Sequence, residues 1–89
     1  MKNRLSSPQI RAARALLNWS AAQLAQISSL GANTIRRAEI ADGDTPLTMA
    51  NDQAIRRALE AAGVEFIDEN GGGAGVRLKK PGAKPSKAK

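Results

Sequence analysis

The sequence predicts a mainly helical domain of four helices over residues 7–63, a C-terminal β-hairpin over 64–79 and a disordered basic tail over 80–89. Its 89 residues allow one small domain and exclude two. Seventeen of the 37 apolar residues are alanine and two residues are aromatic, so the core must come from thin, closely packed helices. The apolar spacing is helical up to Gly63 and alternates after it.

The first helix is expected over residues 8–17. Ser7 can cap its N-terminus, and Pro8 at the first helical position loses no hydrogen bond. Asn18 tolerates the left-handed conformation and so predicts the helix end. The expected buried stripe consists of Ile10, Ala13 and Leu17.

The second helix is expected over residues 21–28. Ser20 and Gln23 have the spacing of a capping box, and Trp19 and Leu24 have that of a hydrophobic staple. The expected inward residues are Leu24, Ala25 and Ile27. Because the break after this helix is only three or four residues long, a tight turn must connect it to the third helix, over 31–40.

The segment 42–46 is rich in turn residues and predicts a surface loop. A fourth, amphipathic helix follows over 48–62 and is stopped by Gly63. Beyond it, a glycine-rich turn separates two alternating runs, which predicts a hairpin that pairs Val64 and Phe66 with Val76 and Leu78 on one face. Because an isolated hairpin is marginal, this one should dock on the helices or pair with a second copy.

The net charge of +6 lies in residues 77–89, which hold six basic side chains and no acid. Residues 1–76 balance, with eight basic and eight acidic side chains. The tail therefore suggests a polyanionic partner, whereas for the body such a partner must be argued from placement.

Several function classes are disfavoured. The chain has no cysteine or histidine, which removes thiolate metal sites and the commonest general base, so we expect no enzyme, no metal and no cofactor. The glycines of 71–75 lack the following helix and the lysine of a nucleotide loop, and the loop acids lack the ligand series of a calcium site. No run is apolar enough for a membrane span or a signal core, so a cytoplasmic protein is expected.

Residues 8–62 resemble the helix-turn-helix domain of the XRE (lambda-repressor-like) family of transcriptional regulators. The resemblance rests on a small residue, a turn residue and a β-branched anchor at Ala25, Leu30 and Ile35. The motifs that support it are Ser20-x-x-Gln-Leu-Ala25, Thr34-Ile35-Arg36-Arg37-x-Glu39 and Ala58-Leu59-Glu60-x-x-Gly63-Val64. The whole chain looks like small stand-alone bacterial members of this group.

The resemblance implies a lambda-repressor-like fold and a partly buried ion pair between Arg14 and Glu39, with a structural role. The chain departs from the family pattern at Ala21, where a glutamine is frequent, and at Gly31, where serine or threonine usually caps the recognition helix. It departs also at Ser29, where glycine is usual because the turn favours a positive φ, so serine should cost about 1 kcal/mol.

Four residues of the predicted third helix can point outward when Ile35 and Ala38 point inward: Ala32, Asn33, Arg36 and Arg37. Asn33 can pair with adenine, Arg36 with guanine and the Ala32 methyl with a thymine methyl, while Arg37 is better placed for a phosphate. Ser20 and the N-terminus of the second helix should hold a phosphate. The alternatives are that the arginines form only a solvated helix face and that the helix pair only packs. Arg56 and Arg57 either cover the DNA backbone or solubilise the fourth helix.

We therefore expect a sequence-specific DNA-binding regulator of transcription, a repressor or a general regulator, that associates with the nucleoid. Its partner is double-stranded DNA, read as two half-sites by a homodimer with the hairpin at or near the interface. The rival function is a protein-interaction module, such as an antitoxin or adaptor that uses the same helices. A large exposed apolar patch would indicate the rival.

Overall fold

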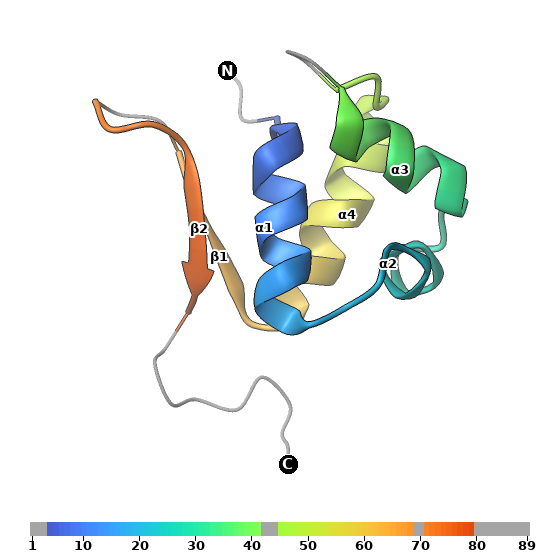
Figure 1. The fold of residues 1–89 in the computed structure, drawn as a ribbon, viewed down its shortest axis with the longest axis horizontal. Helices are drawn as coiled ribbons and strands as arrows, with labels where there is room; N and C mark the ends of the chain where they lie inside the picture. The colour runs from blue at the N-terminus through green and yellow to red at the C-terminus, as the bar shows by residue number, and fades with distance from the viewer. Residues whose placement is uncertain (1–3, 42–44, 69–70, 80–89) are drawn as a thin grey trace.

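Helices α1 (Ser7–Leu17), α2 (Ala21–Ser28), α3 (Ala32–Ile40) and α4 (Met49–Ala61) precede strands β1 (Val64–Ile67) and β2 (Gly75–Leu78). The structure is a computed structural model that describes residues 4–41, 45–68 and 71–79. Within these ranges it has the predicted mainly helical composition and one antiparallel hairpin (Figure 1). The basic tail 80–89 and loop residues 42–44 lie outside the described residues, so their predicted character is not addressed.

The N-terminus of α1 begins one residue earlier than predicted. Ser6, and not the predicted Ser7, is the N-cap, and it forms a capping box with Gln9. Gln9 fixes the start of α1, because its side-chain oxygen accepts a hydrogen bond from the backbone N–H of Ser6, three residues earlier. Ser7 is instead buried inside the helix, and its hydroxyl donates to the carbonyl of Ala38 in α3.

The ends of α1 and α2 both use the left-handed conformation. Asn18 has φ 59° and Ser29 has φ 63°, and these are the two non-glycine residues with positive φ in the described part of the chain. Asparagine tolerates this conformation, whereas serine is strained in it. Helix α2 has its predicted bounds and its predicted capping box between Ser20 and Gln23.

Helices α3 and α4 are each slightly shorter than predicted. Gly31 is the N-cap of α3 and contributes no side-chain hydrogen bond, while Thr48 caps α4 by accepting from the Asn51 N–H. Gly63 follows α4 with φ 106°, a conformation that glycine adopts without a steric penalty. The same positive φ lets the chain leave α4 and enter β1 directly.

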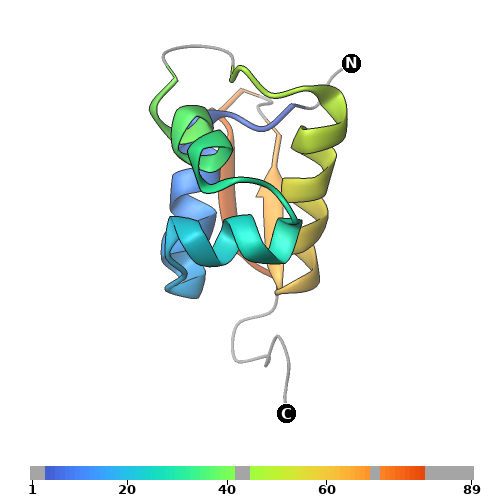
Figure 2. The same ribbon diagram turned by 90° about the vertical axis from the view of Figure 1, so that its right-hand side faces the viewer.

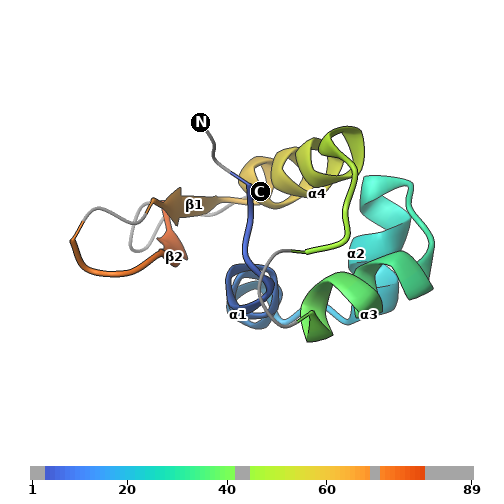
Figure 3. The ribbon, with the colours of Figure 1, turned by 90° about the horizontal axis from the view of Figure 1, so that it is seen from above.

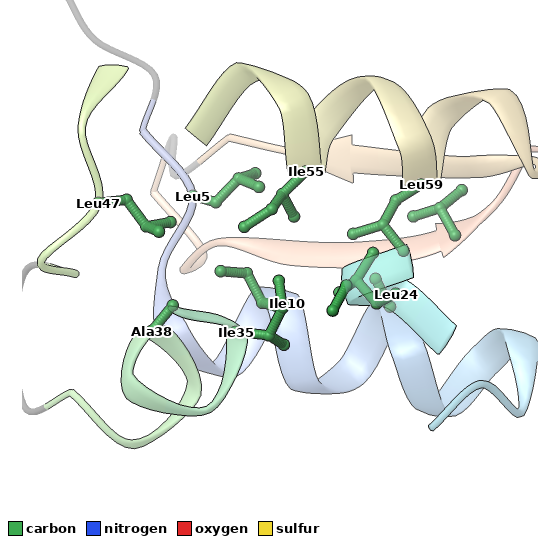
Figure 4. Close-up of a cluster of buried hydrophobic side chains, with 11 residues drawn as sticks. Leu5, Ile10, Leu24, Ile35, Ala38, Leu47, Ile55 and Leu59 are labelled. Atoms are coloured by element: carbon green, nitrogen blue, oxygen red, sulfur yellow. The ribbon is translucent and has the colours of Figure 1, made fainter. Parts of the chain in front are cut away.

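The core lies between α1, α4 and the α2–α3 pair (Figure 4). It is aliphatic, as the composition predicts, and Leu5 and Leu47 join it from outside the helices. The prediction that Ile27 points inward is wrong, since this side chain is 52 % exposed. The inward stripe of α2 runs through Leu24, Ala25 and Ser28, and the Ser28 hydroxyl is satisfied by the Leu24 carbonyl at 2.7 Å.

The hairpin has the predicted register, with Val64 opposite Leu78 and Phe66 opposite Val76. Its apolar face packs on the helices of the same chain: Val64 is fully buried, and Phe66 and Val76 contact the core cluster. Buried Gln9 of α1 connects the two elements, because its Nε2 donates to the Gly75 carbonyl at 3.1 Å. Of the two predicted possibilities, docking on the helices is therefore the one observed.

In the described ranges, no helix is long and apolar enough to cross a membrane.

Candidate nucleic-acid interface

Helices α2 and α3 cross at one end of the molecule (Figure 2), and the crossing depends on three residues. Ala25 is buried on α2 and Ile35 is buried on α3, while Leu30 in the connecting turn packs against the core. The Leu30 N–H donates to the Ala25 carbonyl at 2.8 Å, which closes the turn. The small side chain at residue 25 allows close approach, so the predicted helix pair forms with its predicted anchors.

The outer face of α3 carries Asn33, Arg36 and Arg37, all exposed as predicted. The Arg36 guanidinium lies 3.4 Å from the Asn33 side-chain oxygen, so the two polar side chains project side by side from one helical turn. Ala32 differs from the prediction, because it is half-buried and packs against the core cluster. Part of its surface is therefore turned toward the core and away from solvent.

Ser20 caps α2 and is exposed. Its hydroxyl accepts from the Gln23 N–H at 3.0 Å, and its own N–H donates to the Gln23 side chain at 2.8 Å. The capping box therefore uses two of the backbone donors that the sequence analysis assigned to a phosphate. The N–H groups of Ala21 and Ala22 are left out of the box and remain available to an anion, together with the Ser20 hydroxyl proton.

Arg14 and Glu39 form the ion pair that the resemblance implies. Arg14 Nε lies 2.7 Å from Glu39 Oε2 and Nη2 lies 2.9 Å from Oε1, while Nη1 donates to the Trp19 carbonyl at 2.8 Å. The hydrogen bond to Glu39, reinforced by its charge and opposed by burial, raises the pKa of Arg14 above its ordinary value. Through these contacts Arg14 of α1 is bound to Glu39 of α3 and to the α1–α2 turn at Trp19. The ion pair therefore holds these parts of the fold together.

The ion pair also sets the charge of the α2–α3 surface. Between residues 20 and 41 Glu39 is the one acidic residue, and its side chain is 7 % exposed and paired. Arg36 and Arg37 therefore project from α3 without a competing carboxylate on either helix. Arg11 adds a further cation, since its guanidinium donates to the Glu39 backbone carbonyl at the end of α3. This surface is positive although residues 1–76 balance overall.

A hollow beside α3 was missed by the sequence analysis. It measures about 90 Å³ and is lined by Thr34, Arg37, Pro46 and Leu47. Thr34 and Arg37 share a helix face at i, i+3 spacing, which the sequence does show. The opposite wall comes from the segment 45–48. Thr45 in this segment is buried, which differs from the surface loop predicted over 42–46. No local sequence pattern predicts that this segment lies against α3.

The arginines of α4 separate into two environments. Arg56 lies 3.5 Å from Glu60 and stacks over Phe66 at 5.2 Å from the ring centroid, so it packs toward the hairpin. Arg57 is exposed. Arg56 therefore belongs to the structural contact between α4 and β1. No model of a known protein family and no curated protein matches the chain, so its assignment rests on the residues described above.

Proposed function

We propose that this protein is a sequence-specific DNA-binding regulator of transcription, related to the XRE family, that acts as a repressor and reads the major groove with α3. The observation that carries the proposal is the outer face of α3, where Asn33, Arg36 and Arg37 project while the one carboxylate of the helix pair is neutralised by Arg14. A helix of this kind fits a groove about 12 Å wide. We place the protein in the cytoplasm, on the nucleoid.

Each exposed residue has a chemically suitable target. Asn33 can pair with the adenine edge and Arg36 with the guanine edge, and their proximity suits neighbouring base pairs. Arg37 is assigned to a phosphate, as are the Ser20 hydroxyl and the N–H groups that start α2. Ala32 has less exposed surface for a thymine methyl than its predicted outward position implies, because it packs against the core cluster.

We propose further that the protein binds as a homodimer on two half-sites one helical turn apart. The hairpin, predicted at or near the dimer interface, lies at the opposite end of the longest axis from α2 and α3 (Figures 1 and 3), and the Phe66→Ala sedimentation experiment decides whether it takes part in that interface.

The proposal is tested by selecting bound duplexes from a random pool and measuring binding of the Arg36→Ala variant. We expect a defined preferred site in the selection. The variant should lose about 1–3 kcal/mol on that site and relax its preference at one base pair, because a bidentate contact is removed. Equal losses on preferred and random DNA would show that Arg36 contacts only phosphate, and no selected sequence would contradict sequence-specific binding.

A protein-interaction module remains the second candidate, and exposed Ile27 and Ile40 on the same two helices favour it. Within the described residues, the five large exposed apolar side chains lie on five different elements, and single exposed apolar residues are ordinary. DNA binding that weakens steeply with salt would support the first function. A protein partner that Ile27→Ser and Ile40→Ser variants fail to bind would support the second.

A further inference from the structure

Three side chains of α1 reach the last turn of α3. Ser7, Arg11 and Arg14 have i, i+4, i+7 spacing and so share one face of α1, and the end of α3 lies beside the first half of that helix (Figures 1 and 3). The Ser7 hydroxyl donates to the Ala38 carbonyl, and the Arg11 guanidinium donates to the Glu39 carbonyl. Arg14 binds the Glu39 carboxylate. One face of α1 therefore contacts both the backbone and a side chain at the end of α3.

These contacts take the place of a C-terminal cap on α3. The last four carbonyls of an α-helix have no partner within the helix. Helices α1 and α2 end at left-handed residues whose N–H groups donate back to the helix, whereas α3 ends at Ala41 in an extended conformation. Among the described residues, no backbone N–H donates to the carbonyl of Ala38 or Glu39. The two carbonyls therefore depend on α1, and the positive charge of Arg11 also suits the negative end of the α3 dipole.

We infer that Ser7 and Arg11 are positioning residues for base recognition, an inference that rests on the proposed function. Helix α3 has nine residues, and helices this short are marginal in water without tertiary contacts. Its last turn includes Arg37 and directly follows Arg36, so fraying of that turn would release both side chains from their fixed positions. By capping the turn, Ser7 and Arg11 keep α3 helical to its end and hold these arginines in one arrangement relative to the groove.

The cap affects specific and non-specific binding differently. Base contacts need an ordered helix, and a binding-competent state that is present in only a fraction of the molecules weakens the apparent affinity by that fraction. Attraction of basic side chains to phosphates carries no sequence information and does not depend on the order of a single turn. Loss of the cap should therefore lower the affinity for the preferred duplex more than the affinity for random duplexes.

The first test compares Ser7→Ala with Ser28→Ala in the full chain. Both substitutions remove a buried hydroxyl, but the Ser28 hydroxyl donates to carbonyls of its own helix, at Leu24 and Ala25, and does not contact α3. We expect Ser7→Ala to bind the preferred duplex about three- to tenfold more weakly and random duplexes as the wild type does, because a buried carbonyl loses its partner. We expect Ser28→Ala to keep the wild-type ratio of the two affinities.

Amide hydrogen exchange without DNA measures the cap directly. The N–H groups of Glu39 and Ile40 should exchange faster in Ser7→Ala than in Ser28→Ala, because the last turn of α3 opens locally when its cap is lost. The comparison with Ser28→Ala removes the effect of a general loss of stability. Thermal melting confirms that each variant is folded.

Arg11 supplies an independent test, because its side chain is exposed and its replacement leaves the core intact. Arg11→Met removes both the charge and the donor, whereas Arg11→Lys keeps a cationic donor of the kind that binds carbonyls at helix ends. We expect Arg11→Met to lower the ratio of preferred to random affinity and Arg11→Lys to restore it. Arg57→Gln removes an exposed charge of α4 and should keep the ratio.

The outcomes separate the inference from the proposed function. A positioning role is refuted for either residue whose variant keeps the wild-type affinity ratio or loses affinity equally on all duplexes, and the proposed function then stands. Equal exchange of Glu39 and Ile40 in Ser7→Ala and Ser28→Ala would also overturn the inference. If Ser7→Ala does not fold, the two Arg11 variants decide. A wild type that prefers no duplex would instead overturn the proposed function, and hydrogen exchange would still decide whether α1 caps α3.

Discussion

Replacing Glu39 by glutamine should destabilise the fold more than any other single charge removal on α3. The side chain is 7 % exposed and accepts two hydrogen bonds from Arg14, which is itself 26 % exposed. Glutamine keeps the volume but leaves the guanidinium without its counter-charge. Breaking a fully buried pair costs about 3–5 kcal/mol, and the partial exposure of Arg14 reduces this to about 2–3 kcal/mol.

The assay is urea denaturation followed by the fluorescence of Trp19, the single tryptophan of the chain. Trp19 is a local reporter because its carbonyl accepts from Arg14 Nη1 at 2.8 Å. A double-mutant cycle with Arg14→Met and Glu39→Gln isolates the pair, and we expect a coupling free energy of about 1.5 kcal/mol or more. Glu60→Gln is the matched control, since its partner Arg56 is 3.5 Å away and Glu60 is 43 % exposed.

The raised pKa of Arg14 also predicts how the coupling free energy between Arg14 and Glu39 depends on pH. The pKa of Arg14 is raised in the folded state, so its contribution is present at every pH below its ordinary value and is lost only in strong alkali. The coupling should therefore not change between about pH 7 and pH 10. A coupling below about 0.5 kcal/mol, or an equal cost for Glu60→Gln, would refute the assignment of the pair as a principal connection between α1 and α3.

Three further outcomes follow from individual positions. Ser29→Gly should raise the free energy of unfolding by about 1 kcal/mol, because Ser29 has φ 63° and glycine adopts this conformation freely; a loss of stability on urea denaturation would contradict the strain. Phe66→Ala should lower stability by about 2–3 kcal/mol through lost packing and the lost Arg56 contact, without changing the molecular mass in sedimentation; weakened self-association would instead place the hairpin at a dimer interface. Deleting residues 80–89 removes four lysines and should reduce the log–log salt slope of DNA binding by up to about 3–4, and an unchanged slope would show that the tail does not contact DNA.

The candidate site was predictable where it depends on one helix. The exposure of Asn33, Arg36 and Arg37 follows from the inward positions of Ile35 and Ala38, because side chains on a helix repeat every 3.6 residues. The hollow was not predictable, since its apolar wall comes from a segment whose distance from Thr34 depends on how the chain returns from α3 to α4.

The sequence by itself determined the local features of this protein. The capping box of Ser20 and Gln23, the left-handed end of α1 at Asn18 and the register of Phe66 with Val76 each involve neighbouring residues or one short turn. Such features depend on backbone geometry that repeats every two to four residues. They therefore form in the same way wherever the elements pack.

Only the tertiary structure decided which side chains join distant parts of the chain. Asp52 of α4 is buried and accepts from the Leu5 N–H at 3.0 Å, Gln9 connects α1 to the hairpin, and Ile27 lies outside the core that its apolar character suggested. The residues in these contacts are separated by 47 and 66 positions, so no local spacing encodes them. They arise because close packing of the helices brings Asp52 and Gln9 to backbone partners that are far away in the sequence, and that condition involves the whole chain at once.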